Sequence, residues 1–145
     1  MAAIDNLMQA ISGGWSQHAR FLRLTTSLGA DTLVAESMHG WEAVDHGGFR
    51  LELTALASDP KLPVTTLIGA PVLLEWLRAS ASRDYRPFHG HVAAAELLGY
   101  NGGLARYRLV LEPWLASLRQ SQDSYAYQDA TVVEISEQIF GYLSK

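Results

Sequence analysis

Two histidines, His89 and His91, are the residues whose type and spacing come closest to a chemical site in this chain. They stand two apart on a predicted strand, so both side chains point to the same side of it. Two imidazoles on one side can begin a metal site, but a zinc site needs three or four ligands and no third ligand stands nearby. We therefore predict an exposed or partner-facing pair and no bound metal.

Other catalytic patterns are missing from the sequence. It has no phosphate-binding loop, dinucleotide fingerprint or nucleophile elbow, and it contains no cysteine. Ser12, Ser16, Ser27 and Ser37 have no recognisable catalytic context. We therefore predict that the protein is not an enzyme and uses no cofactor.

The four tryptophans are many for a chain of 145 residues. Tryptophan is common in cores and is also enriched at interfaces. We predict a core position for Trp76. Trp114 follows Pro113 at the end of a predicted strand, and both a core and an interface position remain open for it.

Composition indicates a single domain that meets a partner. Hydrophobic residues make up 48% of the chain, but charged residues only 18%, against about 25% in typical soluble domains. Exposed apolar surface is therefore expected, and such surface usually contacts another protein. The net charge is −4 without a basic block, which argues against nucleic acid as a partner. No apolar run reaches the roughly 20 residues of a membrane helix, and no secretory signal is recognised.

Alternating apolar and polar residues predict a mainly β chain. The alternation is cleanest in Phe49–Thr54 and Arg106–Glu112, as expected for half-buried antiparallel strands. Gly-rich residues 99–103 predict a hairpin turn between the last two strands. The predicted strands are Arg20–Thr26, Leu33–Met38, Phe49–Thr54, Pro71–Arg78, Phe88–Leu98 and Arg106–Glu112.

A few short helices accompany these strands. An apolar stripe predicts a short amphipathic helix over Ile4–Ser12, which either covers its own domain or docks on another subunit. Single turns are predicted at Val64–Leu67 and Trp114–Arg119. Asp129 is the predicted N-cap of a C-terminal helix, and Gly141 is its predicted stop.

The predicted fold is an antiparallel β-barrel or strongly bent sheet with a C-terminal helix. Residues 1–19 are expected to form an N-terminal extension, and residues 20–145 a β-barrel module.

The chain carries an ordered series of motifs. They are Arg20-Phe-Leu-Arg-Leu-Thr-Thr-Ser-Leu-Gly29, Leu33, Gly40-Trp-Glu42, Phe49-Arg-Leu-Glu52, Leu67-Ile-Gly-Ala-Pro-Val72, Phe88-His-Gly-His-Val92, Gly103-Leu-Ala-Arg-Tyr-Arg-Leu-Val-Leu-Glu-Pro-Trp114 and Tyr127-Gln-Asp129. This series resembles the N-terminal region of the VgrG (Vgr, Rhs-element-associated) spike proteins of the type VI secretion system, which are similar to the baseplate hub of contractile phage tails. The resemblance spans about residues 20–140.

The resemblance implies a structural role. In the family, three chains form a hub on a tube of stacked Hcp rings, and the N-terminal part of each chain supplies barrel modules. The implied partners are the Hcp tube, other VgrG chains, baseplate components and effectors. Assembly in the cytoplasm and export by the type VI machine, without a signal peptide, are implied as well.

Within the shared motifs, a set of residues stands out as interface candidates. Phe88 and Val92 share one strand face, Gly90 between them allows close backbone approach, and Pro113 with Trp114 ends a strand and plugs its end. The full set is Phe88, His89, Gly90, Val92, Arg106, Tyr107, Pro113, Trp114, Gln128 and Asp129.

The sequence departs from the family in three places. Tyr125 and Ala126 stand where the family has a basic and a large aliphatic residue. The segment before Arg20 is longer than expected, and the sequence ends at Lys145 without the OB-like domain and needle of a whole spike. We therefore expect a first barrel of a longer protein or a truncated remnant that cannot cap a tube alone. The alternative function is a small β-barrel adaptor that binds a ligand or an effector.

Overall fold

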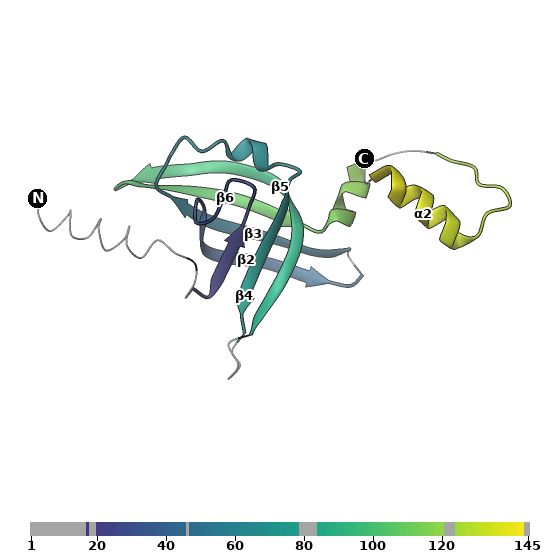
Figure 1. Cartoon of the computed structure of the whole chain (residues 1–145), viewed down its shortest axis with the longest axis horizontal. Coiled ribbons are helices and arrows are strands. Elements are labelled where there is room, and N and C mark those ends of the chain that lie inside the picture. Colours follow the sequence, from purple (N-terminus) through teal and green to yellow (C-terminus); the bar gives the residue numbers. More distant parts are fainter. Residues whose placement is uncertain (1–16, 18–19, 46, 79–83, 121–123, 144–145) are drawn as a thin grey trace, which may run out of the picture.

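A computed structural model of the chain describes residues 17, 20–45, 47–78, 84–120 and 124–143 (Figure 1). Within them, six strands form one antiparallel sheet in the order β1-β4-β5-β6-β3-β2. The strands are β1 (Leu22–Thr25), β2 (Val34–Ala43), β3 (Gly48–Ala57), β4 (Pro71–Leu77), β5 (Tyr85–Asn101) and β6 (Leu104–Glu112).

The long strand β5 gives the sheet its curl. Its first half pairs with β4 up to His91, and its second half pairs with β6 from His91 onward. Two register shifts interrupt the β5–β6 ladder, and such bulges bend a strand. As a result β4 and the first half of β5 run across β6, β3 and β2 (Figure 1). The sheet is a half-barrel, which confirms the predicted mainly β, antiparallel fold class.

The core lies on the concave face of this sheet. In β3 and β6 every second residue points inward, and the inward set includes Leu51, Leu53, Tyr107 and Leu109. The alternation predicted for these two strands is therefore confirmed. The turn between β5 and β6 consists of Gly102 and Gly103, both with positive φ, as a two-residue hairpin requires.

The outward face of the sheet carries ion pairs between strands. Arg108 lies 2.7 Å from Glu96 on one side and 3.9 Å from Glu52 on the other. Arg106 reaches Glu36 at 2.8 Å. These side chains are between 34% and 55% exposed, so each pair contributes little to stability, but together they give this face a polar surface.

Three short helices complete the described chain: η1 (Val64–Leu67), η2 (Trp114–Gln120) and α2 (Val132–Leu143). The first two match the predicted turns. The helix α2 lies beyond the end of the sheet, next to η2 (Figure 1). None of the helices in the described residues has the length and apolar character needed to span a bilayer.

Two predictions about α2 were wrong. Its cap is Thr131, whose hydroxyl accepts a hydrogen bond from the Glu134 N–H, while the Glu134 carboxylate accepts one from the Thr131 N–H. This is a capping box. Asp129 instead adopts a left-handed conformation with φ 53°. Gly141 does not stop the helix, which continues to Leu143.

The prediction of a core position for Trp76 was also wrong. Trp76 is 45% exposed rather than a core residue, because it lies near one end of β4, opposite Leu22. The predicted N-terminal helix over residues 4–12 lies outside the described residues.

Candidate functional site

Phe88 and Val92 share one face of β5, as predicted, and this face is buried. Phe88 packs edge-on against Phe49 of β3 with ring centroids 5.6 Å apart. The Arg86 guanidinium lies 4.8 Å from the centre of the Phe88 ring and binds the Glu42 carboxylate at 2.6 Å. This cluster joins the first half of β5 to the ends of β2 and β3 across the mouth of the half-barrel.

At Gly90 the backbones of β5 and β6 approach each other closely. A Cβ atom at this position would lie 2.6 Å from the Glu112 carbonyl oxygen and 3.1 Å from the Phe49 ring. The predicted role of Gly90, to allow close backbone approach, is therefore confirmed by the geometry. The tight fit lets β5 turn from β4 toward β6 at this point.

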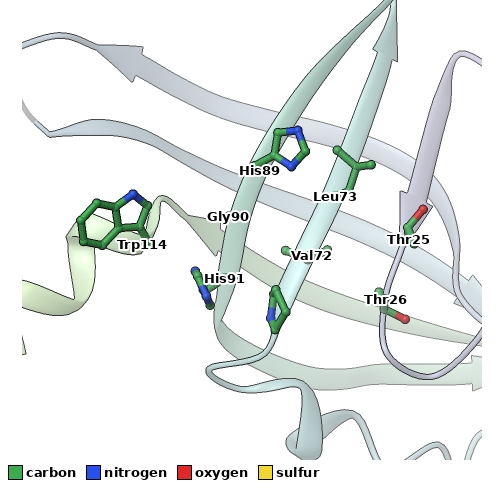
Figure 2. A pocket seen from close by; sticks show the side chains of 9 residues that line it. Thr25, Thr26, Val72, Leu73, His89, Gly90, His91 and Trp114 are labelled. Atoms are coloured by element: carbon green, nitrogen blue, oxygen red, sulfur yellow. The ribbon is translucent and has the colours of Figure 1, made fainter. Parts of the chain in front are cut away.

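His89 and His91 point outward from the same stretch of β5. Both line a shallow hollow of about 320 Å³, together with Thr25, Leu73 and Trp114 (Figure 2). Among the described residues, no group of three or more histidine, aspartate or glutamate side chains is arranged to hold a metal ion. The Nδ1 atom of His91 is buried and has no hydrogen-bond partner within the described part of the chain.

Trp114 connects this hollow to a second one. The second hollow, of about 310 Å³, lies between β5 and η2 and is lined by Ile68, Val92, Pro113 and Trp114, among others. Trp114 is 45% exposed, and its indole packs edge-on against Phe140 of α2 with ring centroids 5.3 Å apart. The indole therefore stands at the surface, between the half-barrel and the C-terminal helix.

Arg106 and Tyr107 serve different purposes, although they are adjacent on β6. Arg106 is exposed and pairs with Glu36. Tyr107 is fully buried, and its hydroxyl donates to the Asp59 carbonyl at 2.9 Å and accepts from the Leu62 N–H at 3.3 Å. It therefore holds the loop between β3 and η1 against the core.

Gln128 and Asp129 are exposed in the segment before α2. Together with Arg106 and Tyr107 they line neither hollow. The residues that the structure does bring together around Trp114 are His89 and Gly90 in the first hollow and Val92 and Pro113 in the second. An interface role for any of these residues stays a prediction.

Sequence reasoning missed part of the exposed apolar surface near Trp114. Ile68, Leu115 and Phe140 are each more than a third exposed. Ile68 and Leu115 lie at the ends of short 3-10 turns, where no periodicity indicates which side faces solvent. The low content of charged residues was the only signal, and it does not say where the apolar surface lies. The chemistry of this surface suits burial of apolar side chains from another protein.

A family model matches most of the chain. It describes the phage tail baseplate hub (GPD), and the match covers residues 42–145.

Curated relatives come from one organism, Pseudomonas aeruginosa PAO1. The type VI secretion system spike protein VgrG1b is 35% identical over 125 residues, and VgrG1c is 33% identical over 126 residues. These matches cover 86% and 87% of this chain but only 16% and 17% of the relatives. The chain thus spans about a sixth of the length of these spike proteins.

A solved structure shows the same fold. It is that of the E. coli c3393 protein, a component of the type VI secretion system with structural similarity to the T4 bacteriophage tail proteins gp27 and gp5. The TM-score is 0.65 at 24% identity, with 81% of this chain and 31% of the other chain covered. On the extent of the family match and its agreement with the curled sheet, the chain belongs to the phage tail baseplate hub family and is similar over most of its length to VgrG spike proteins.

Proposed function

We propose that this chain is a structural hub module of a type VI secretion spike, and that it contributes to a trimeric hub seated on the Hcp tube. The observation that carries the proposal is the hub-family match over residues 42–145. The spike-protein relatives, which align with 86% of the chain, support the same role.

The architecture suits a part that transmits force. All six strands belong to one antiparallel sheet, and five ladders connect them in series. The backbone hydrogen bonds of such ladders and the packed core resist deformation together. No step of this role needs a reacting group, because the work is done by packing and strand pairing.

Docking is assigned to the surface formed by Ile68, Trp114, Leu115 and Phe140, which we call the Trp114 surface. Its four side chains are between 41% and 51% exposed. Large aromatic residues in apolar surroundings dominate binding energy at protein interfaces. The partners proposed for the module are the Hcp tube, other VgrG chains, baseplate components and effectors. Assembly takes place in the cytoplasm, and the type VI machine exports the finished spike.

The experiment measures binding of the purified chain to purified Hcp rings by analytical ultracentrifugation. Trp114→Ala is compared with Trp76→Ala, because both indoles are 45% exposed in the free chain. We expect Trp114→Ala to weaken binding about 10-fold or more and Trp76→Ala to leave the Kd within about twofold. If the two substitutions weaken binding equally, the Trp114 surface is not the docking surface. If the wild-type chain does not bind the Hcp rings, the proposed binding to the tube is wrong.

An adaptor function is the second candidate. The hollows on either side of Trp114 measure about 320 and 310 Å³, which is near the lower limit of ligand pockets. An effector or a small ligand that binds the chain in the absence of Hcp rings, and is displaced by substitutions at the hollows, would favour this function over the hub.

A further inference from the structure

The two edges of the half-barrel face each other without a strand ladder. β1 and β2 approach one another, but among the described strands β1 pairs only with β4 and β2 only with β3. The Gln17 side chain bridges the boundary between these two edges, which we call the seam. The Gln17 amide nitrogen donates to the carbonyl oxygens of Leu24 at 2.9 Å and Leu33 at 3.3 Å, and its amide oxygen accepts from the Leu24 N–H at 2.5 Å.

Every polar group of Gln17 has a partner. In addition to the side-chain bonds, its backbone N–H donates to the Asp31 carboxylate at 3.2 Å. Its carbonyl oxygen accepts from the Arg20 N–H at 3.2 Å and from the Arg23 Nε at 3.3 Å. Gln17 is only 8% exposed, and a buried amide costs free energy unless it is hydrogen-bonded in this way.

The side-chain amide of glutamine carries the same donors and acceptor as a peptide group. By bonding to both the N–H and the C=O of Leu24, it does what a neighbouring strand residue would do. A strand, however, would repeat these bonds along its length, whereas a side chain makes them only once. Within the described residues, the Gln17 side chain therefore bridges the two edges where no strand ladder joins them, and regions with few backbone hydrogen bonds open at lower free energy than the core.

We propose that Gln17 is the lock of this seam: its side chain holds β1 against the start of β2. When the lock releases, the edges at Leu24 and Leu33 open together while the core around Leu53 stays closed. The seam is then the place where the curvature of the module can change, whichever partner it binds.

Amide hydrogen exchange of the full chain tests the lock. In Gln17→Ala, the Leu24 amide loses its acceptor, so its exchange should accelerate about 10-fold more than that of Leu53, a fully buried residue of β3. Gln138→Ala, at an exposed glutamine of α2, is the control and should leave the ratio of the two rates within about twofold. The proposal is overturned if Gln17→Ala accelerates Leu24 and Leu53 by the same factor, or changes neither.

A second variant keeps the test decisive if Gln17→Ala does not fold. Gln17→Glu still accepts from the Leu24 N–H but, when ionised, presents a carboxylate to two carbonyl oxygens. Burial raises the pKa of the introduced carboxyl. In acid its one O–H donates to one of the two carbonyl oxygens and so retains part of the lock, which is lost as the pH rises through that pKa. The charged groups around the seam are Asp31, Arg20 and Arg23, and Arg23 also lies over the Tyr85 ring at 3.9 Å.

Between about pH 5 and pH 8, the protection of Leu24 relative to Leu53 should fall about 10-fold in Gln17→Glu and stay within about twofold in the wild type. If, at pH 8, the protection of Leu24 relative to Leu53 in Gln17→Glu equals that of the wild type, Gln17 does not lock the seam.

Discussion

Gly90 shows how a missing side chain allows β5 and β6 to approach closely. Any side chain there would press against the Glu112 carbonyl oxygen, which belongs to the backbone of β6 and cannot rotate away. Phe49 closes the site from the other side. The close packing where β5 changes partners therefore depends on glycine at this position.

We predict that Gly90→Ala lowers the free energy of unfolding by about 2 kcal/mol, because the added methyl group overpacks a closed site. Gly99→Ala is the matched control, since a Cβ atom at Gly99 of the same strand meets no atom within 4 Å. Urea denaturation of the two variants measures the difference. A Gly90→Ala variant as stable as Gly99→Ala would show that β5 and β6 can separate at no cost.

The hydrogen-bond partners of buried polar residues could not be predicted from the sequence. Gln17 lies in a stretch without periodicity, and its side-chain partners are backbone groups 7 and 16 residues away. Tyr107 fits the alternation of its strand, but its contact with Asp59 spans 48 residues. Such partners are known only once the chain has folded. The wrong core prediction for Trp76 has the same origin, since residue type alone does not place an indole at the end of a strand.

At the scale of elements, α2 shows how two cap signals compete. Aspartate is a favoured N-cap, and Asp129 fits that pattern. The Thr131-x-x-Glu134 pattern of a capping box, however, is the one found at the start of α2. Hydrogen bonds from the Thr131 N–H, and then from its hydroxyl, hold the pKa of Glu134 below its usual value. The ionised form of Glu134 is therefore the one that stabilises the start of α2.

We predict that Thr131→Val accelerates amide exchange at Glu134 about fivefold, because the hydroxyl that accepts from this N–H is lost. Asp129→Gly, which tolerates the left-handed backbone at this position, should leave that exchange unchanged. NMR exchange measurements on both variants decide which residue is the cap. Faster exchange in Asp129→Gly than in Thr131→Val would show that Asp129 is the cap of α2.

The same capping box gives α2 a pH dependence. A carboxyl whose pKa is lowered in the folded state stabilises it above the ordinary pKa of glutamate, and this contribution is lost as the pH falls through the lowered value. We therefore expect the first turn of α2 to fray in acid, as the pH falls below the ordinary pKa of glutamate and through the lowered pKa of Glu134. Glu134→Gln should remove most of this change in the ¹³Cα chemical shifts of α2, and an unchanged acid transition would contradict the assignment.

Strands were predictable where the pattern is local. Alternation located β3 and β6, and the glycine pair located the hairpin between β5 and β6. The sheet order was not predictable, because the neighbours β1–β4 and β3–β6 are separated by long stretches of sequence. Bulges interrupt the β2–β3 and β5–β6 ladders, so inward and outward residues do not alternate strictly along β2 and β5. The alternation of apolar and polar residues is therefore weaker in these two strands than in β3.

At the scale of the whole molecule, the described chain forms one half-barrel with an exposed apolar surface at one end. The resemblance implies a hub in which each of three chains supplies two related barrels to a six-fold tube. The described residues form a single sheet. If that sheet corresponds to one barrel of the implied hub, three copies of this segment by themselves would supply three of six contacts.

We predict that the isolated chain is a monomer or only weakly self-associating at micromolar concentration. Its Trp114 surface is apolar enough for weak self-association. Because this surface consists of only a few large side chains, it does not supply the extensive buried area that stable dimers need. Light scattering after size exclusion measures the mass. A stable trimer or hexamer would show that the module closes a ring by itself.

A chimera, in which this chain replaces the corresponding segment of a whole spike protein, tests whether the chain is a hub module. In P. aeruginosa VgrG1b, the region aligned with this chain, 125 residues at 35% identity, is replaced by the corresponding residues of this chain. Release of Hcp into the medium is then measured in a strain that depends on this spike. The account predicts that the chimera restores Hcp release, and that the same chimera with Trp114→Ala releases less than one with Trp76→Ala. A chimera that accumulates as a folded trimer at the wild-type level, yet releases no Hcp, would contradict it.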